Sequence, residues 1–137
     1  MFWTCPNCNR EFHNTNQPHS CVITPIEKHF AKTLPSVQQL YNQLIQQVEN
    51  FGVIRIASVK NAILISNRTT FLACKLSKTY LILEFFLDHE EDLFPVYKTV
   101  RISKRRVVHF VKLQSEEELD NQLLVWLKSS YELIAKG

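Results

Sequence analysis

Three of the four cysteines lie near the N-terminus and have the spacing of metal ligands. Cys5 and Cys8 form a C-x2-C pair in the stretch CPNC, and Cys21 follows later. A tight turn of this kind directs two thiolates at one ion, and a structural zinc ion takes four tetrahedral ligands from cysteine and histidine. The sequence therefore predicts one zinc ion (Zn2+) bound near the N-terminus.

Two histidines compete to be the fourth zinc ligand. We favour His19, which gives the set Cys5, Cys8, His19 and Cys21. His13 remains an alternative, because C-x2-C-x4-H resembles the start of a zinc knuckle, although Cys21 comes too late for that pattern. A set with both histidines and without Cys21 is a third alternative. Four protein ligands leave no position for water, so we expect a structural zinc ion that folds a segment too short to fold alone.

A second group of candidate residues is basic. Residues 95–115 contain no acid, and clustered lysine and arginine side chains can neutralise phosphates. Nearby Phe94, Tyr97 and Phe110 could stack on bases. The alternative is a solvated loop whose charge offsets the acidic stretch at residues 88–92. The candidate nucleic-acid-binding residues are Lys98, Arg101, Lys104, Arg105, Arg106 and Lys112.

Glu84 and His109 are candidates for acid–base chemistry, although no catalytic set is complete. An acid within an apolar strand needs a partner or access to solvent, and Lys75, Arg55 or His109 could serve as the partner of Glu84. His109 could act with Glu84 or Tyr80 if they met across the sheet, whereas a lone strand histidine is more often packed and hydrogen-bonded. The other acids are bunched elsewhere, so we find no carboxylate set of the kind that a nuclease needs.

Three further basic residues and the fourth cysteine have simpler interpretations. Lys60, Arg68 and Lys75 fall on or beside the predicted sheet, where they could line an anion-binding face or discourage edge-to-edge aggregation. Cys74 lies in the apolar stretch FLACKL, and we interpret it as a small core residue.

Helical and strand patterns indicate the elements that position these residues. Apolar residues recur at helical spacing over residues 36–50, and Phe51-Gly52 ends that run. Residues 53–87 are rich in β-branched and aromatic residues and predict an antiparallel meander of about four strands. The last of these, TYLILEFFL, is almost wholly apolar and is predicted to be central.

The C-terminal third predicts a loop, a strand and a helix. Residues 88–105 are polar and predict a long loop or a drawn-out hairpin. VVHFVKL then predicts a fifth strand. The final helix is predicted to begin at Ser115, with Glu118 completing a capping box. The apolar face of this helix comprises Leu119, Leu123, Trp126, Leu127, Tyr131 and Ile134.

The 137 residues, 45% of them hydrophobic and 21% charged, fit an ordinary globular chain. We predict an α+β fold in which a zinc-binding hairpin precedes a helix, an antiparallel sheet of about five strands and a C-terminal helix. The predicted organisation is a zinc-binding segment at 1–24, a linker at 25–35 and an α+β domain at 36–137. Glycine occurs only twice, which argues against glycine-rich phosphate loops and the dinucleotide fingerprint.

The chain has no apolar run near the roughly 20 residues of a membrane span. The start MFWTCPNC lacks the basic residues and long apolar stretch of a signal peptide. We therefore expect a cytoplasmic protein with no membrane partner. In a reducing cytosol, cysteines are more often metal ligands or buried residues than disulfides.

Two groups of motifs resemble an uncharacterised bacterial family, a domain of unknown function. The first is Trp3-x-Cys5-Pro6-x-Cys8, with Arg10 and Phe12, followed by Asn16-Gln17-x-His19-Ser20-Cys21. The second is the stretch VHFVKL, followed by Glu118-Leu119-Asp120 and by Trp126-Leu127 with Tyr131. The resemblance covers nearly the whole chain and implies that the histidine next to the last cysteine is the ligand, as His19 is here. Asn9 stands where the family commonly has glycine.

The sequence predicts a binding module without enzymatic activity, which contacts nucleic acid through the basic segment or contacts another protein. One alternative is an interaction or assembly module that uses the sheet or the zinc hairpin. Another is an enzyme with a cleft that contains Glu84 and His109. The oligomeric state does not follow from the sequence.

Overall fold

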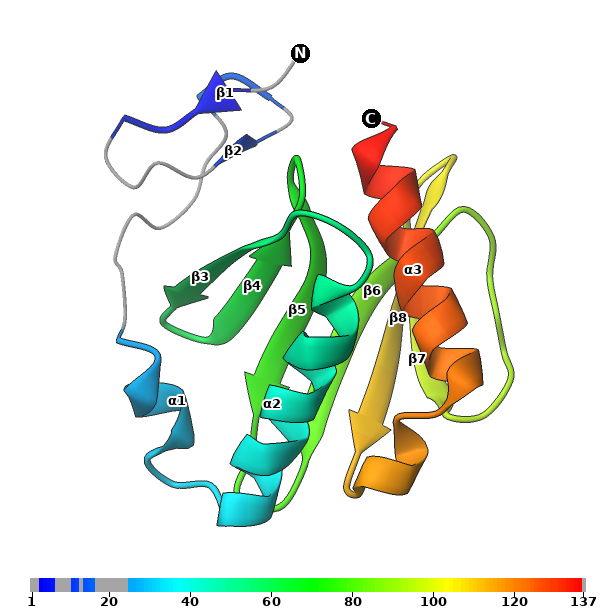
Figure 1. Ribbon diagram of the computed structural model, residues 1–137. Helices are drawn as coiled ribbons and strands as arrows, with labels where there is room; N and C mark the ends of the chain where they lie inside the picture. Colours follow the sequence, from blue (N-terminus) through cyan, green and yellow to red (C-terminus); the bar gives the residue numbers. More distant parts are fainter. Residues whose placement is uncertain (1–2, 7–10, 13, 17–24, 137) are drawn as a thin grey trace.

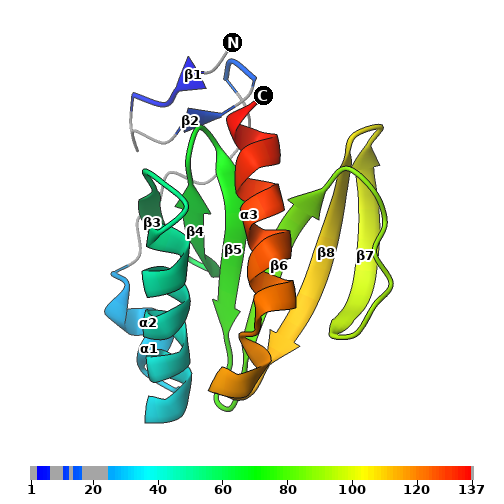
Figure 2. The ribbon, with the colours of Figure 1, turned by 45° about the vertical axis from the view of Figure 1, so that its right-hand side comes forward.

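The computed structural model describes residues 3–6, 11–12, 14–16 and 25–136 (Figure 1). Its main body is one antiparallel sheet of six strands with two long helices on one face (Figures 1 and 2). The helices are α2, Pro35–Glu49, and α3, Asn121–Ala135. The predicted α+β fold is confirmed for this part of the chain.

The sheet has the strand order β3-β4-β5-β6-β8-β7, and every neighbouring pair is antiparallel. The first four strands form the predicted meander, and the chain then crosses over β8 to reach the edge strand β7. The strand bounds are β3 Arg55–Val59, β4 Ala62–Ser66, β5 Thr70–Leu76, β6 Leu81–Leu87, β7 Val96–Ser103 and β8 Arg106–Leu113. β6 lies between β5 and β8, so it is central, as predicted.

The core lies between the sheet and the two helices. Strand side chains alternate between the two faces of a sheet, and in β6 the four leucine and phenylalanine residues at odd numbers, Leu81, Leu83, Phe85 and Leu87, are buried. From the helices, Leu44 and Val48 of α2 and Leu123 and Leu127 of α3 are at 0% exposure. The apolar spacing of both helices therefore matches the faces that pack on the sheet.

The sheet has six strands rather than the predicted five, because residues 96–103 form β7. Only the second half of its sequence VYKTVRIS alternates apolar and polar residues, and the charges of Lys98 and Arg101 made the segment resemble a loop. An edge strand tolerates such charges, since one side of it faces solvent and the charges hinder pairing with another chain.

The final helix begins later than predicted. The capping box of Ser115 and Glu118 is present, but it closes a short 3-10 turn at Glu116–Glu118. Asp120 is the residue that caps α3, because its side chain accepts a hydrogen bond of 2.9 Å from the backbone N–H of Leu123. The buried face of α3 contains Leu123, Trp126, Leu127 and Ile134, as expected, and also Ser130.

Near the N-terminus, β1 (Trp3–Thr4) and β2 (Glu11–Phe12) pair as an antiparallel two-stranded ribbon. The rings of Trp3 and Phe12 lie 6.0 Å apart across it. An ion pair of 2.8 Å between Glu11 and Arg55 joins this ribbon to β3. The short helix α1, Glu27–Phe30, follows and packs the ring of Phe30 edge-on against Tyr41 at 5.3 Å. No helix among the described residues is long and apolar enough to cross a membrane.

Candidate functional site

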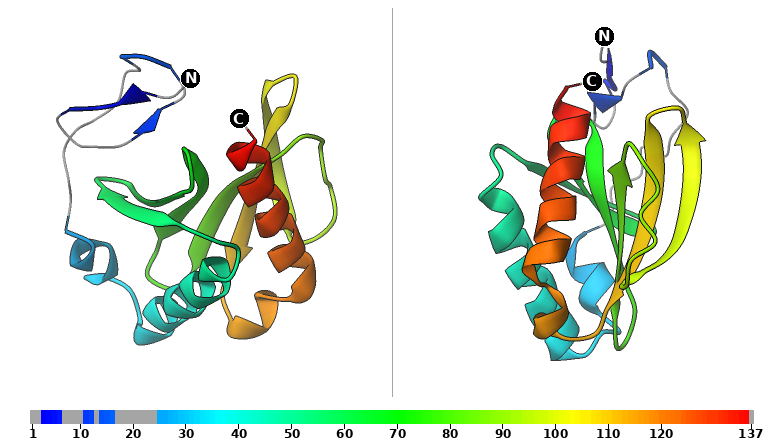
Figure 3. Two further views of the ribbon diagram at one scale, coloured as in Figure 1. Left: turned by 45° about the horizontal axis from the view of Figure 1, so that its top comes forward. Right: turned by 90° about the vertical axis from the view of Figure 1, so that its right-hand side faces the viewer.

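The two faces of β6, β8 and β7 differ, because α2 and α3 lie on one side only (Figure 3). We call the side toward the helices the covered face and the other side the open face. The register places Glu84 opposite Phe110, and Phe110 opposite Lys98. The open face comprises Lys75, Tyr80, Ile82, Glu84, Phe86, Tyr97, Lys98, Val100, Val108, Phe110 and Lys112.

A β-bulge places two side chains of β7 beside one ring of β8. The register shifts between Val96 and Lys98, so Tyr97 has no partner of its own in β8. The ring of Tyr97 lies 6.3 Å from that of Phe110, and the Lys98 ammonium lies 5.1 Å from the centre of the same ring. A bulge re-directs a side chain in this way. The result is an aromatic pair, in which Tyr97 is exposed and Phe110 is half-buried, with a cation beside it.

Lys112 and Tyr80 form a second pair of a lysine and a ring on the open face, near the start of β6. The Lys112 ammonium lies 4.2 Å from the centre of the Tyr80 ring, within the range of a cation–π interaction. Lys75 forms an ion pair of 2.8 Å with Glu84, which gives Glu84 one of the partners expected from the sequence. Burial, and then the charge of Glu84, raise the pKa of the Tyr97 hydroxyl, so this ring stays neutral at physiological pH. The open face thus combines three lysines, one glutamate and four rings that are at least partly exposed.

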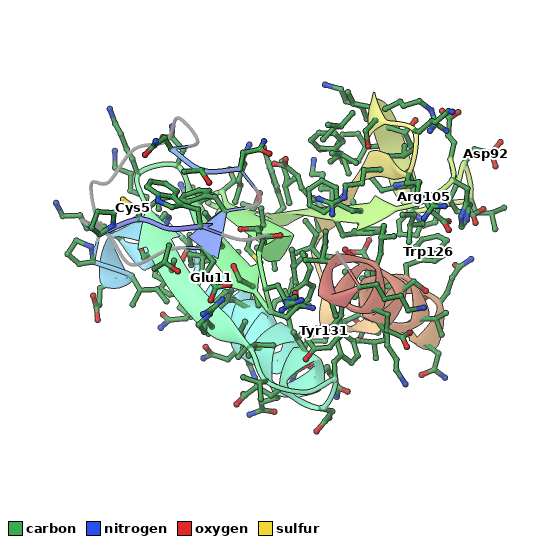
Figure 4. The ribbon with its side chains drawn as sticks, turned by 90° about the horizontal axis from the view of Figure 1, so that it is seen from above. Cys5, Glu11, Asp92, Arg105, Trp126 and Tyr131 are labelled. Carbon is green, nitrogen blue, oxygen red and sulfur yellow. The ribbon has the colours of Figure 1, made fainter. Side chains whose placement is uncertain are left out.

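The predicted basic residues do not form one patch. Lys98 and Lys112 lie on the open face, whereas Arg101 donates hydrogen bonds to the carbonyls of Ser103 and Lys104 and so holds the β7–β8 turn. Arg105 and Arg106 line an open cleft of about 760 Å³ between that turn and the end of α3. The cleft also contains Leu87, Asp88, His89, Ser129, Glu132, Leu133 and Lys136. Figure 4 shows Arg105 and Asp92 on one side of the molecule and Cys5 and Glu11 on the other.

His109 and Glu84 lie on opposite faces of the sheet, so the predicted cleft containing both is wrong. His109 pairs with Phe85 in the register, and its ring stacks on that of Phe85 at 5.5 Å on the covered face. His109 is at 0% exposure, whereas Glu84 is partly exposed on the other side. The reason is the alternation of side chains along β8. Val107, His109 and Val111 are two residues apart, so all three face the helices.

The hydrogen bonds of His109 give it a structural role. Its Nε2 accepts a bond of 2.9 Å from the backbone N–H of Glu91, so the proton is on Nδ1, which donates to the carbonyl of Val107 at 2.9 Å. Burial lowers the pKa of His109, which favours this neutral form. His109 therefore fastens the segment between β6 and β7 to the sheet.

A family model described as "Domain of unknown function (DUF5655)" matches residues 26–134. The chain belongs to the DUF5655 family. The match includes both long helices and all six strands of the main sheet, and hence the whole open face. No curated protein and no solved structure matches the chain. Membership of DUF5655 therefore assigns no activity.

The predicted zinc ligands precede the DUF5655 region. Of these, Cys5 is described, whereas Cys8, His19 and Cys21, and the alternative ligand His13, lie outside the described residues. Cys5 directly follows β1 and is 3% exposed. Within the described ranges, no three histidine, cysteine or acidic side chains are grouped so that they could hold a metal. The zinc set stays a prediction.

Cys74 lies in the middle of β5 on the covered face and is fully buried. Burial raises the pKa of its thiol far above the usual range, and the charge of Glu84 adds to that effect. A thiol of this kind is not reactive at neutral pH. Its interpretation as a core residue therefore agrees with its position.

Proposed function

We propose that this DUF5655 protein binds single-stranded nucleic acid on the open face of its sheet. The observation that carries the proposal is the alternation of cations and rings there, with Lys98 beside Phe110 and Lys112 over Tyr80. Rings provide stacking surfaces for bases, and lysines beside them neutralise the phosphates between the bases. Three lysines and one glutamate give this surface the charge that complements a polyanion.

A single strand suits this surface better than a duplex. Stacking on a protein ring requires an unpaired base, because duplex bases already stack on each other. Tyr97 is 54% exposed and lies on an edge strand, so a base can reach its ring without a change in the sheet. Val100 and Ile102 extend the exposed surface along β7 at 43% and 60% exposure. A strand running along β7 and β8 would meet rings and lysines in turn.

Two matched double variants test the proposal. Lys98→Ala with Lys112→Ala removes two charges from the open face, and Arg105→Ala with Arg106→Ala removes two from the cleft near α3. Binding of fluorescein-labelled 12-nucleotide single strands would be followed by anisotropy at several salt concentrations. Loss of two phosphate contacts should reduce the slope of log K against log salt by about 1.4 in the first variant only. Equal slopes in both variants, or no binding to any single strand, would refute the proposal.

Stacking can be tested separately from charge. Tyr97→Ala should weaken binding to single strands by roughly 1–3 kcal/mol, whereas Tyr97→Phe should retain most of the affinity because the ring remains. A duplex of the same sequence should bind more weakly than its single strands. Equal loss in Tyr97→Ala and Tyr97→Phe would show that the hydroxyl, rather than the stacking surface, matters.

We also propose that the N-terminal segment binds one structural zinc ion through Cys5, Cys8, His19 and Cys21. Two features of the described residues support it: β1 and β2, which precede and follow the CPNC stretch in the sequence, pair as a ribbon, and Cys5 next to β1 is buried. Four such ligands give the closed tetrahedral site that zinc prefers in a structural role. The ion pair of Glu11 with Arg55 would hold this zinc ribbon against β3.

Metal content measured on purified variants tests the ligand set. Cys5→Ser, Cys21→Ser and His19→Ala should each lose zinc, whereas His13→Ala should retain one zinc ion per chain. Cys74→Ala is the matched control, since it removes a buried cysteine that is not in the predicted ligand set. Full zinc content in the Cys5→Ser or Cys21→Ser protein would exclude that residue from the set.

A protein partner is the second candidate function. The edge strand β7 hydrogen-bonds to β8 on one side and carries exposed Val100 and Ile102. An extended segment of another protein could add to such an edge. Light scattering with an added acidic peptide, compared with the Val100→Asp variant, would distinguish this function from nucleic-acid binding.

A further inference from the structure

Glu84 is the one acid on the open face, at a place where a phosphate chain would be repelled. It lies in the centre of β6, opposite Ala73 of β5 and Phe110 of β8. The same cross-strand row continues to Lys98 of β7. A carboxylate beside the proposed stacking rings needs a reason, because it opposes the attraction that the lysines provide.

The two carboxylate oxygens of Glu84 have different surroundings. Oε2 is buried and lies 2.8 Å from the Lys75 ammonium, which offsets its charge. The side chain as a whole is 20% exposed, so the accessible part includes atoms other than Oε2. No described residue donates a hydrogen bond to Oε1. Glu84 therefore offers a positioned hydrogen-bond acceptor toward the open face.

The two neighbours of Glu84 across the strands differ in size. Ala73 contributes only a methyl group on one side, and the Phe110 ring lies on the other. Because Glu84 lies directly opposite Phe110, a base stacked on the Phe110 ring would bring one of its edges beside Glu84. The acceptor of Glu84 is thus at the position where that edge would be read.

A carboxylate distinguishes bases by their donors. Guanine presents two adjacent donors, N1–H and the N2 amino group. Uracil and thymine place a carbonyl oxygen on each side of N3–H, and these oxygens are repelled by a carboxylate. Adenine and cytosine each place one amino donor next to a ring nitrogen acceptor. We propose that the open face prefers single strands that contain guanine and that Glu84 is the residue that reads it. This inference rests on the proposed binding of single strands.

A set of short oligonucleotides tests the inference. Nine-nucleotide uridine strands would carry guanine, inosine, adenine, cytosine or uracil at the central position. Anisotropy should show about tenfold tighter binding for guanine than for uracil, the difference of one good pair of hydrogen bonds. Inosine, which lacks the N2 amino group, should fall between them. Equal affinity of the wild-type protein for all five strands would overturn the inference.

A variant locates the preference at Glu84. Glu84→Gln keeps the size of the side chain but loses the charge, so the ratio of guanine to uracil affinity should fall to near one. Lys98→Ala is the matched control, which should weaken all five strands by the same factor and leave the ratio unchanged. An unchanged ratio in Glu84→Gln would show that the residue serves only its ion pair with Lys75.

The outcomes separate this inference from the function on which it rests. Binding of all single strands without base preference would leave the proposed function standing and exclude reading by Glu84. Absence of binding to every strand would exclude the proposed function itself. The comparison of guanine with inosine and uracil uses the wild-type protein, so it tests the guanine preference even if Glu84→Gln does not fold.

Discussion

The covered and open faces of β6 use alternate residues of one seven-residue strand. Leu83 and Phe85 face the helices at 0% exposure, whereas Ile82, Glu84 and Phe86 face the other way and stay partly exposed. The same strand therefore serves the fold on one side and the proposed site on the other. The two faces should respond differently to substitution: stability should depend on the covered face, and binding on the open face.

The largest expected effect is on the covered face at Phe85. Its ring stacks on His109 and on Trp126, the latter at 6.3 Å, so Phe85→Ala would leave a cavity between the sheet and α3. The free energy of unfolding should fall by about 3–5 kcal/mol. Urea denaturation measures this, with the partly exposed neighbour Phe86→Ala as control. An equal loss in both variants would contradict the division between the faces.

Ser130 should give the next largest effect, because one hydroxyl joins α3 to two strands. It donates a hydrogen bond of 2.7 Å to the carbonyl of Phe71 and accepts one of 2.9 Å from the backbone N–H of Phe86. Ser130→Ala leaves the buried carbonyl of Phe71 and the part-buried N–H of Phe86 without this partner, so the free energy of unfolding should fall by about 1–3 kcal/mol. Ser129→Ala, at an exposed neighbour, should change stability by less than about 0.5 kcal/mol.

Acid should weaken the covered face through His109. Because burial lowers its folded-state pKa below the usual 6.5, the unfolded chain binds the proton more readily. Its contribution to stability is complete above pH 6.5 and is lost as the pH falls below that value. Thermal melting between pH 7.5 and 5.5 should show this loss, and His109→Gln should flatten the profile.

His89 should change the stability with pH in the opposite direction to His109, so it serves as a control. A hydrogen bond to Asp88 raises the pKa of His89, so its contribution is present at low pH and fades as the pH rises. His89→Gln should therefore make the loss of stability on acidification steeper. A wild-type profile that rises on acidification would show that His109 is not the dominant group.

The smallest expected effect on stability is on the open face. Lys98 and Lys112 are exposed, and their contacts are with rings at the surface. Replacing each with alanine should change the free energy of unfolding by no more than about 0.5 kcal/mol. Chemical denaturation of the variants used for binding checks this. A larger loss would mean that a change in binding reports on folding rather than on the site.

The sequence predicted most of the main body. The helical spacing of apolar residues predicted α2, because it leaves one consistent face to bury, and a nearly continuous apolar run predicted the central strand β6. Strand β7 was missed because charge dominated its composition, and only its position at the edge makes that composition suitable for a strand. The start of α3 was misplaced because a capping box also closes a single 3-10 turn.

The candidate site was less accessible to sequence reasoning. Lys98, Lys112, Tyr97 and Phe110 were named as candidates, but their assembly on one face depends on the bulge at Tyr97, which no local pattern signals. The separation of Arg105 and Arg106 from these residues depends on the turn that Arg101 holds. The face of His109 depended on the register of β8 with β6, which is a long-range property.

The exchange of β7 and β8 in the strand order also protects the protein from a competing fold. In a simple six-strand meander, β7 would lie between β6 and β8, and the charged side chains of Lys98 and Arg101 would stand on an interior strand rather than on the edge. The segment from residues 88 to 95 instead carries the chain beyond the position next to β6. The apolar VVHFV stretch of β8 then pairs with β6, and the charged strand β7 forms the edge of the sheet. Lys98 thus disfavours the wrong topology and also supplies a cation to the open face, whereas Arg101 disfavours the wrong topology and holds the β7–β8 turn.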